Sequence, residues 1–538
     1  MLRISEIRLP LDHKPEALKA AILAKLRIPA EALLGFAVFK RAHDARKKSS
    51  IQLIYIVDVE LKDEARTLAR FEKDSHVRPT PDLEYKFVAR APESLSERPI
   101  VVGAGPCGLF AALILAQSGF RPILLERGKV VRERTKDTWK LWRKSELNPE
   151  SNVQFGEGGA GTFSDGKLYS QIKDPRFLGR KVLTEFVKAG APEDILTEAH
   201  PHIGTFRLVT MVESLRATIE SLGGEYRFQS HVTDFHIETA PDGTRQIRGV
   251  ILKDGTHIAS NHVVLALGHS ARDTFYKLHE RGVYVEAKPF SIGVRIEHPQ
   301  SLIDKARFGA CAGNPILGAA EYKLVHHARN GRDVYSFCMC PGGTVVAATS
   351  EENRVVTNGM SQYSRNERNA NSGIVVGISP DMDYPGHPLA GIDFQRRYES
   401  LAFVAGGSNY NAPAQRLGDF LVGRASTELG NVVPSYRPGV TPTDLSQCLP
   451  DFAITAMREA LSVFGKQIPG YDMEDAVMTG VETRTSSPIR IKRGEDFESI
   501  NTKGLYPAGE GAGYAGGILS AGVDGIKVAE ALALSLVK

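Results

Sequence analysis

The sequence predicts an α/β protein whose central unit is a parallel sheet assembled from separated parts of the chain. A buried apolar strand near residue 100 runs into a glycine-rich turn and then a small-residue helix. A second apolar strand stops at Gly268, and a third stops at Gly509, shortly before a final helix. Because such strand–turn–helix units share one parallel sheet, the long stretches between them must form further domains.

The composition agrees with a protein of several domains. The chain has 538 residues, 42% of them hydrophobic, so it can bury more than one core. Its formal net charge of +4 is too small to imply nucleic acid by itself. The five cysteines are widely spread, which argues against a disulfide framework and suits a reducing compartment. The start lacks the apolar run of a signal peptide and no long apolar stretch follows, so we expect a soluble, cytoplasmic protein with no membrane partner.

The first glycine-rich turn has the spacing of a dinucleotide site. Gly103 permits a tight turn, Gly105 lets the main chain approach a pyrophosphate, and Gly108 lets the following helix lie close to the sheet. The start of that helix presents unpaired N–H groups to the phosphates. A second strand ends at Glu126, where a carboxylate can accept hydrogen bonds from both ribose hydroxyls. The flanking strand, helix and acid favour this interpretation over a plain glycine-rich loop.

The end of the chain indicates that the dinucleotide is FAD rather than NAD. A short strand closes on Gly509 and Glu510, and a glycine-lined helix begins near Gly516, Gly517 and Ile518. The acid can hold the ribityl chain or its adjoining phosphate. The helix N-terminus can aim N–H groups at the N1–C2=O edge of the flavin, where negative charge collects on reduction. The alternative is that these glycines only allow close packing.

The strand at 262–267 supplies the middle piece. It follows hairpin-like strands with turn signals at 241–243 and 254–255, as expected for a small β-meander that returns to the nucleotide sheet. The three pieces together predict one FAD domain. The predicted cofactor-binding residues are Gly103, Gly105, Pro106, Cys107, Gly108, Glu126, Arg127, Gly158, Gly159, Ala160, Gly161, Thr162, Lys167, Val232, Ala266, Leu267, Gly268, Gly509, Glu510, Gly516, Gly517 and Ile518.

Several further runs have no generic nucleotide role, and with them the chain resembles a known group of proteins. It is similar to the glutathione-reductase-like FAD superfamily of NAD(P)/FAD-dependent oxidoreductases, and more closely to the bacterial family of uncharacterised FAD-dependent dehydrogenases. The resemblance covers nearly the whole chain and implies a bound FAD and an oxidoreductase, but no particular substrate. The runs that carry it lie at 155–168, 337–343, 356–361, 482–488 and 509–517.

Four domain segments follow from these assignments. They are an N-terminal α+β domain (1–95), the first part of a two-dinucleotide-binding-type, Rossmann-like FAD domain (96–275), an inserted α+β substrate domain (276–480) and the C-terminal part of the FAD domain (481–538). Strand patterns at 283–286, 290–297, 334–339 and 345–348, with helical patterns at 393–404 and 451–464, predict a mixed sheet in the inserted domain. No second Gly-x-Gly-x-x-Gly follows a strand, so any NAD(P)H that reduces the flavin must dock transiently.

Two segments have open interpretations. The order of strands and helices in 1–95 favours a compact α+β domain such as the ferredoxin-like fold. The glycine-rich, polar stretch 151–170 cannot build a core, so it either wraps FAD or forms a plain surface loop. A basic loop in the N-terminal domain is either a solvated hairpin tip or a patch for RNA, phosphate or a partner. Its residues are Lys40, Arg41, Arg46, Lys47 and Lys48.

The cysteines allow several roles. Cys338 and Cys340 alternate on a predicted strand, so both side chains face one side of it. They are either small packing residues, a thiol near the flavin, or part of a zinc site with His326 and His327, although no Cys-x-x-Cys accompanies them. We therefore predict no metal. Cys107 lies in the phosphate turn, where packing requires a small side chain.

The segment 482–490 is the predicted catalytic segment, because it precedes the final FAD motif and is rich in hydrogen-bond donors. Arg484 can clamp a carboxylate or carbonyl of the substrate while the flavin takes a hydride at N5. The alternative is that Glu482 and Arg484 form a buried structural pair. Further candidates are Arg295, Asn358, Tyr514 and Cys338 in the cleft, and His269 and Arg272 at the adenine side or the domain junction.

The sequence thus predicts an FAD-dependent oxidoreductase with a small-molecule substrate over the isoalloxazine. Two other classes stay open. One is an RNA-linked flavoprotein that uses the basic loop, and the other is a non-catalytic module in which FAD is structural.

Overall fold

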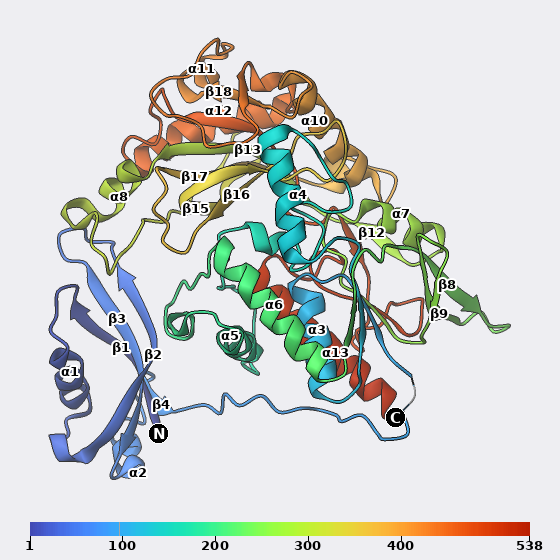
Figure 1. Cartoon of the computed structure of the whole chain (residues 1–538). Helices are drawn as coiled ribbons and strands as arrows, with labels where there is room; N and C mark the ends of the chain where they lie inside the picture. The colour runs from blue at the N-terminus through green and yellow to red at the C-terminus, as the bar shows by residue number, and fades with distance from the viewer. Residues whose placement is uncertain (96) are drawn as a thin grey trace.

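The computed structural model describes residues 1–95 and 97–538, and Figure 1 shows how their elements are arranged. The protein is a mixed α/β structure built on several sheets. The predicted domain boundary at residue 96 lies outside the described residues. Within those residues, no helix is both long and apolar enough to cross a membrane.

The central sheet has five parallel strands in the order β22-β11-β5-β6-β7. Every residue of β5, β6, β11 and β22 is buried, which explains why these strands are continuous apolar runs rather than alternating ones. Pieces from the start, middle and end of the chain therefore lie side by side. The strands are β5 Ile100–Val102, β6 Ile123–Leu125, β7 Glu225–Arg227, β11 Val263–Leu265 and β22 Leu505–Pro507.

Helices cover this sheet. The helix α3 (Pro106–Gln117) is apolar on all sides because α13 (Ile518–Leu536) and α6 (Thr205–Ser221) pack against it. Figure 1 shows these three helices beside one another in the centre of the molecule. Helix α4 (Val131–Lys144) contacts α6, and α5 (Leu178–Lys188) contacts α13. Helix α7 (Arg272–Glu280) instead packs against the first strand of the meander described next.

The predicted meander is an antiparallel sheet of three strands in the order β10-β9-β8. Its strands are β8 Val232–Thr239, β9 Arg245–Leu252 and β10 His257–Ala259. A separate two-stranded ribbon joins β12 (Val285–Ala287) to β21 (Ile489–Ile491). The strand expected at 283–286 therefore belongs to this ribbon and not to the mixed sheet, because its pairing partner comes from the last part of the chain.

The largest sheet has eight strands in the order β14-β15-β17-β13-β20-β18-β19, with β16 also paired to β15. All pairs are antiparallel except β18–β19, so the sheet is mixed. The patterns at 334–339 and 345–348, expected as two strands, form one long irregular strand, β15. The strands are β13 Phe290–Pro299, β14 Val325–His327, β15 Asp333–Ala347, β16 Thr357–Ser361, β17 Asn369–Ile378, β18 Ala412–Arg416, β19 Val440–Pro442 and β20 Val477–Glu482.

The outer face of this sheet is covered by α12 (Asp451–Gln467) and α10 (Ala390–Ala405), drawn in orange at the top of Figure 1. The buried residues of α12 recur at helical spacing, from Ala453 through Met457 and Leu461 to Phe464, so one stripe faces the sheet. The smaller helices here are α8 Gln300–Phe308, α9 Pro380–Asp383 and α11 Leu417–Val422.

The N-terminal sheet is antiparallel, with the order β2-β3-β1-β4 and its own apolar core. The element order is β-α-β-β-α-β, the order of ferredoxin-like domains. Figure 1 shows this unit, in blue, joined to the rest by an extended segment. The elements are β1 Leu2–Pro10, α1 Glu16–Leu26, β2 Leu33–Asp44, β3 Gln52–Leu61, α2 Glu64–Arg70 and β4 Val77–Pro79.

Candidate cofactor and active site

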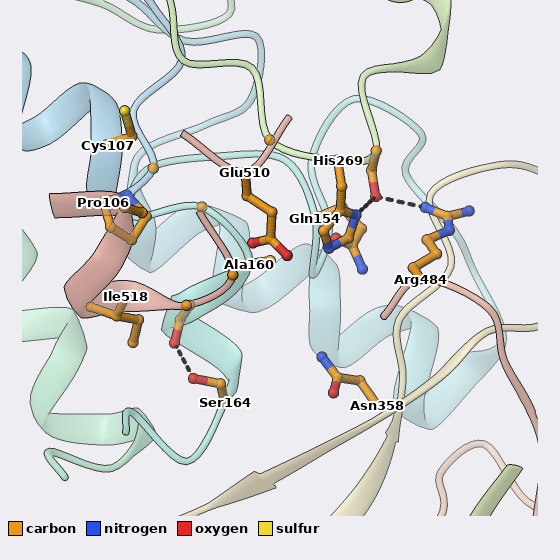
Figure 2. A pocket seen from close by; sticks show the side chains of 18 of the residues that line it. Pro106, Cys107, Gln154, Ala160, Ser164, His269, Asn358, Arg484, Glu510 and Ile518 are labelled. Carbon is orange, nitrogen blue, oxygen red and sulfur yellow. Dashed lines mark hydrogen bonds between the residues drawn. The ribbon is translucent and has the colours of Figure 1, made fainter. Parts of the chain in front are cut away.

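A cavity of about 570 Å³ lies between the carboxyl ends of the central strands and the inner face of the large sheet. One side of its wall comes from the phosphate turn, the glycine-rich loop and the start of α13. The opposite side comes from β15, β16 and the end of β20. Figure 2 shows Glu510 pointing into this space, with Pro106, Cys107 and Ile518 on one side and His269 and Arg484 on the other. Ligands of open α/β sheets bind at this end of the strands.

The phosphate turn is built as the glycine spacing predicts. Gly103 has φ +104°, and a Cβ there would lie 2.2 Å from the carbonyl oxygen of Ala266. A Cβ on Gly108 would lie 1.8 Å from the carbonyl oxygen of Gly103, so only glycine lets α3 approach the sheet this closely. Helix α3 begins at Pro106 with Gly105 as its N-cap, which leaves the first N–H groups directed towards the cavity.

Glu126, at the end of β6, holds three parts of the site together. Its buried carboxylate accepts hydrogen bonds from the backbone N–H groups of Ala104 (2.9 Å), Gly128 (2.8 Å) and Gly156 (2.9 Å). Each carboxylate oxygen has two acceptor positions, so Glu126 can still accept from a ribose that lies against it. The next residue, Arg127, stacks over the Phe155 ring at 4.0 Å.

The glycine-rich loop is ordered by Arg134, a residue that the sequence interpretation missed. Its guanidinium is fully buried and donates 2.7 Å hydrogen bonds to the carbonyl oxygens of Asn152, Val153 and Glu157. Burial lowers the pKa of Arg134 to about 10, so it stays charged at neutral pH. The sequence feature that could have identified Arg134 is its position on the buried stripe of α4, between Val131 and Thr138.

The other end of the cavity is formed by β22 and the start of α13. Burial raises the pKa of Glu510 to about 7, although the nearby Lys288 acts in the opposite direction. Gly517 is the N-cap of α13, and a Cβ added to Gly516 or Gly517 would meet nothing within 4 Å. The helix start therefore faces open space that a ring system can occupy, which fits the flavin end of FAD.

The structure brings most of the predicted cofactor residues to the wall of this one cavity. Four of them lie behind the wall and position it. Gly108 packs as described, and the Gly158 N–H donates to the carbonyl oxygen of Ala104 at 2.8 Å. The Thr162 hydroxyl lies 3.4 Å from Arg134 Nη1, and the Gly509 N–H donates to Asp524 at 2.7 Å.

The alternative in which Glu482 and Arg484 are buried structural residues is right about their burial but not about their pairing, because each has another partner. Glu482 pairs with Arg295 at 2.7 Å, and both side chains are buried. Arg295 also donates to Asn358 Oδ1 at 3.1 Å and to the carbonyl oxygen of Cys338 at 2.7 Å. Burial raises the pKa of Glu482 despite the opposing effect of Arg295. Arg295 thus ties β13 to three residues of the cavity wall.

Arg484 lines the cavity, but its guanidinium is already engaged. It forms two 3.1 Å hydrogen bonds with the buried carboxylate of Glu399 on α10. It also donates to the hydroxyls of Ser270 (3.0 Å) and Ser350 (2.6 Å). Arg272 shares the same carboxylate at 2.6 Å and so lies at the junction of α7 and α10. The structure therefore does not present Arg484 as a free substrate clamp.

Two other candidates differ in their access to the cavity. His269 lines it, as Figure 2 shows, and its Nδ1 shares a 3.0 Å hydrogen bond with the Ser270 hydroxyl. Burial, with Arg484 and Arg272 nearby, lowers the pKa of His269 to about 3, so its ring is neutral. Tyr514 is not among the lining residues. Its hydroxyl accepts from the Arg493 N–H at 3.0 Å.

The cysteine pair lies on strand β15 but not in a regular alternation. The strand is irregular at Cys338, which lines the cavity, whereas Cys340 is buried beside it. His326 and His327 pair with Glu459 and Asp333. In the part of the chain that the structure describes, no group of three or more His, Cys, Asp or Glu residues could hold a metal.

Lys40 and Arg41, expected in the basic loop, lie within β2. Arg41 pairs with Glu198 at 2.5 Å, and Arg46 pairs with Asp44 at 2.5 Å. These two cations are therefore neutralised by neighbours of the same chain. A link to RNA through Lys47 and Lys48 stays a prediction.

Comparison with known proteins matches two parts of the chain to family models. Residues 289–485 match the family described as "FAD-dependent protein, C-terminal domain-like", and residues 1–60 match "Domain of unknown function (DUF8436)". An uncharacterised protein of Clostridium beijerinckii is 48% identical over 532 residues, which is 98% of this chain and 98% of that protein.

Solved structures give weaker likenesses. CtdE in complex with FAD is 13% identical over 82% of this chain and 85% of its own, with a TM-score of 0.30. The halogenase PltM is 12% identical over 82% of this chain and 70% of its own, with a TM-score of 0.37. At such scores neither supports a statement about substrate or reaction. The near full-length relative shows that this chain belongs to one family with the Clostridium beijerinckii protein, and residues 289–485 match the C-terminal domain of FAD-dependent proteins.

Proposed function

We propose that this protein is an oxidoreductase that binds FAD in the cavity described above and transfers a hydride between its flavin and a small molecule. The observation that carries the proposal is that residues from three distant segments line one cavity: Gly105 of the phosphate turn, Gly268 after β11 and Gly517 before α13. A dinucleotide is the kind of ligand that needs all three.

The residues of the chain fit the parts of FAD in order. The start of α3 holds the pyrophosphate, since its N–H groups and partial positive charge face the cavity. Glu126 accepts from the adenosine ribose. The N–H groups at the start of α13 lie at the flavin end and stabilise negative charge there. Bound FAD supplies the two-electron chemistry.

The large sheet closes the other side of the cavity and supports the substrate. Asn358 lines the cavity and is held by Arg295, so its amide group is fixed for hydrogen bonding. The neutral ring of His269 offers one donor and one acceptor position without adding a charge. Lys167, from the glycine-rich loop, lines the same space and donates to the carbonyl oxygen of Met339. These residues orient a polar small molecule against the flavin.

If the small-molecule substrate does not itself reduce the flavin, the proposed electron donor is NAD(P)H. No second dinucleotide motif follows a strand, so the nicotinamide must enter the same cavity from solvent rather than occupy its own domain.

The first test is FAD binding by the purified apoprotein. Gly105→Val places a branched side chain where the main chain meets the pyrophosphate and next to Gly159, whose Cα lies 3.7 Å from an added Cβ. We expect at least a tenfold loss of FAD affinity. The control is Gly35→Val in β2, where a Cβ meets only Glu60, at 4.0 Å. Wild-type protein that stays colourless after addition of FAD would refute the proposal.

The second test is an anaerobic stopped-flow measurement of flavin bleaching by NADH, NADPH and a panel of polar metabolites. Rapid bleaching by one of them identifies the donor. A flavin that binds but is reduced by none of them supports the non-catalytic module instead.

A further inference from the structure

Strand β15 changes its conformation where it passes the cavity. Its register against β17 is regular up to Phe337 and then shifts twice, before Cys340 and again before Gly343. Cys338, in the middle of the first shift, has φ +42°, a left-handed conformation that residues with a Cβ rarely adopt. Backbone of this kind persists only where the surrounding structure enforces it, and it is concentrated at functional sites.

Two cations hold this distorted turn from different elements. Arg295, on β13, donates to the carbonyl oxygen of Cys338 at 2.7 Å. Lys167, from the glycine-rich loop, donates to the carbonyl oxygen of Met339. Both positive charges therefore lie beside the Cys338 side chain, which lines the cavity. The charged and titratable groups that interact with the two thiols are Asp165, Lys167, Tyr169, Arg295, Tyr322, Arg365, Glu482 and Glu510.

The surroundings shift the pKa values of the two thiols in opposite directions. A hydrogen bond from Cys340 lowers the pKa of Cys338 against the effect of burial, and Arg295 and Lys167 act in the same direction as that bond. The same contact and burial raise the pKa of Cys340. The Cys340 thiol also lies 3.3 Å from the carbonyl oxygen of Cys338. A thiolate facing the ligand with a protonated thiol behind it is the arrangement of an attacking and a resolving cysteine.

We propose that Cys338 and Cys340 form a second redox centre, which exchanges an electron pair with flavin bound in the cavity. The inference rests on the proposed function for the identity of its electron partner. A disulfide between residues two apart closes a small, strained ring, and strained disulfides are readily reduced. Such a pair suits a catalytic store of electrons rather than a structural link.

The exchange balances without a further reactant. In the oxidising direction, the Cys338 thiolate and the Cys340 thiol form an S–S bond, and the thiol releases its proton. The two electrons and that proton pass to oxidised flavin, which becomes the singly protonated reduced anion. The reverse step opens the disulfide and restores one thiolate and one thiol. The fully reduced protein then holds four electrons instead of two.

An anaerobic dithionite titration of the FAD-loaded protein counts these electrons. The protein is first oxidised with diamide, which is then removed. Wild type should take up four electrons per flavin, and Cys340→Ser should take up two. The control is Cys311→Ser, which removes a partly buried cysteine outside the cavity and should leave the uptake at four. Wild type that binds FAD and takes up only two electrons would overturn the inference.

A second measurement needs no flavin, so it separates failure of this inference from failure of the proposed function. Apoprotein treated with diamide is digested without reduction, and the peptides are analysed by mass spectrometry. We expect a linked Cys338–Cys340 peptide. We also expect iodoacetamide to alkylate Cys338 of the untreated protein with a midpoint well below the ordinary cysteine pKa of about 8.5, and this midpoint should rise in Cys340→Ala. Two free thiols after diamide, or a midpoint near 8.5 in wild type, would overturn the pair.

Discussion

The acid at the end of β22 gives the pH dependence that can be worked furthest from the structure. Burial raises the pKa of Glu510 from its ordinary value of 4.5 to about 7, with Lys288 opposing the rise. Between these pH values the unfolded chain has lost a proton that the folded protein keeps. The free energy of unfolding therefore falls as pH rises through this window, and the contribution of Glu510 is flat above it. One pKa unit corresponds to about 1.4 kcal/mol, so the upper limit is about 3 kcal/mol.

Glu510→Gln should remove this slope, because the amide keeps the shape of the carboxyl but does not titrate. The measurement is urea unfolding of both apoproteins at pH 5, 6, 7 and 8. The stability of wild type relative to the variant should fall by about 1–3 kcal/mol from pH 5 to pH 7.5, the lower figure allowing for water in the open cavity. A control is Glu238→Gln on β8, where the side chain is 54% exposed. Parallel curves for wild type and Glu510→Gln would refute the reasoning.

The same proton should affect FAD binding, and three further variants test the rest of the site. Above pH 7 the ionised Glu510 repels the anionic pyrophosphate, so the affinity of wild type for FAD should fall by up to about tenfold per pH unit. The affinity of Glu510→Gln should stay level over the same range. Fluorescence titration measures both. Gly108→Ala should lower the free energy of unfolding by at least about 1–3 kcal/mol, because the added methyl group pushes α3 from the sheet. Gly517→Ala, with open space around it, should weaken FAD binding without lowering Tm. Equal effects of the two variants on Tm would contradict this. Arg134→Met should leave three buried carbonyl groups unpaired and so lower the free energy of unfolding by about 2–4 kcal/mol. The glycine-rich loop should then be cut more readily by a protease. Unchanged cleavage kinetics would argue against a role of Arg134 in ordering this loop. Glu399→Gln should destabilise the protein by about 3–5 kcal/mol in urea unfolding, because two buried arginines lose their shared carboxylate; a loss below 1 kcal/mol would contradict the network.

The parts of the site that the sequence predicts well depend on local backbone chemistry. Gly103 and Gly108 were assigned to a tight turn and a close helix, and added Cβ atoms at these positions would overlap the backbone. Glycine has these roles because it lacks a Cβ, which is a property of the residue itself. The neighbouring sequence is therefore enough to identify the turn and the close helix. The same holds for Gly517 at the start of α13, where the helix boundary follows the glycine run.

The errors concern residues whose partners come from other elements. The sequence leaves open that Glu482 and Arg484 pair with each other. Their actual partners, Arg295 on β13 and Glu399 on α10, depend on how distant strands and helices pack. Likewise, the turn at Cys338 depends on the register between β15 and β17, which no local pattern encodes.

The order of strands in the central sheet has a consequence for biosynthesis. Strand β22 pairs with β11 at one edge of the sheet, although the strands of the large sheet lie between the two in the chain. While the chain is being made, β11 therefore has an unsatisfied edge, open to other chains, until β22 emerges. The wall of the proposed cofactor cavity also needs the start of α13, so it is complete only after that later segment has folded. A substitution that keeps β22 from pairing should therefore yield an aggregating chain rather than a folded protein with a weaker site.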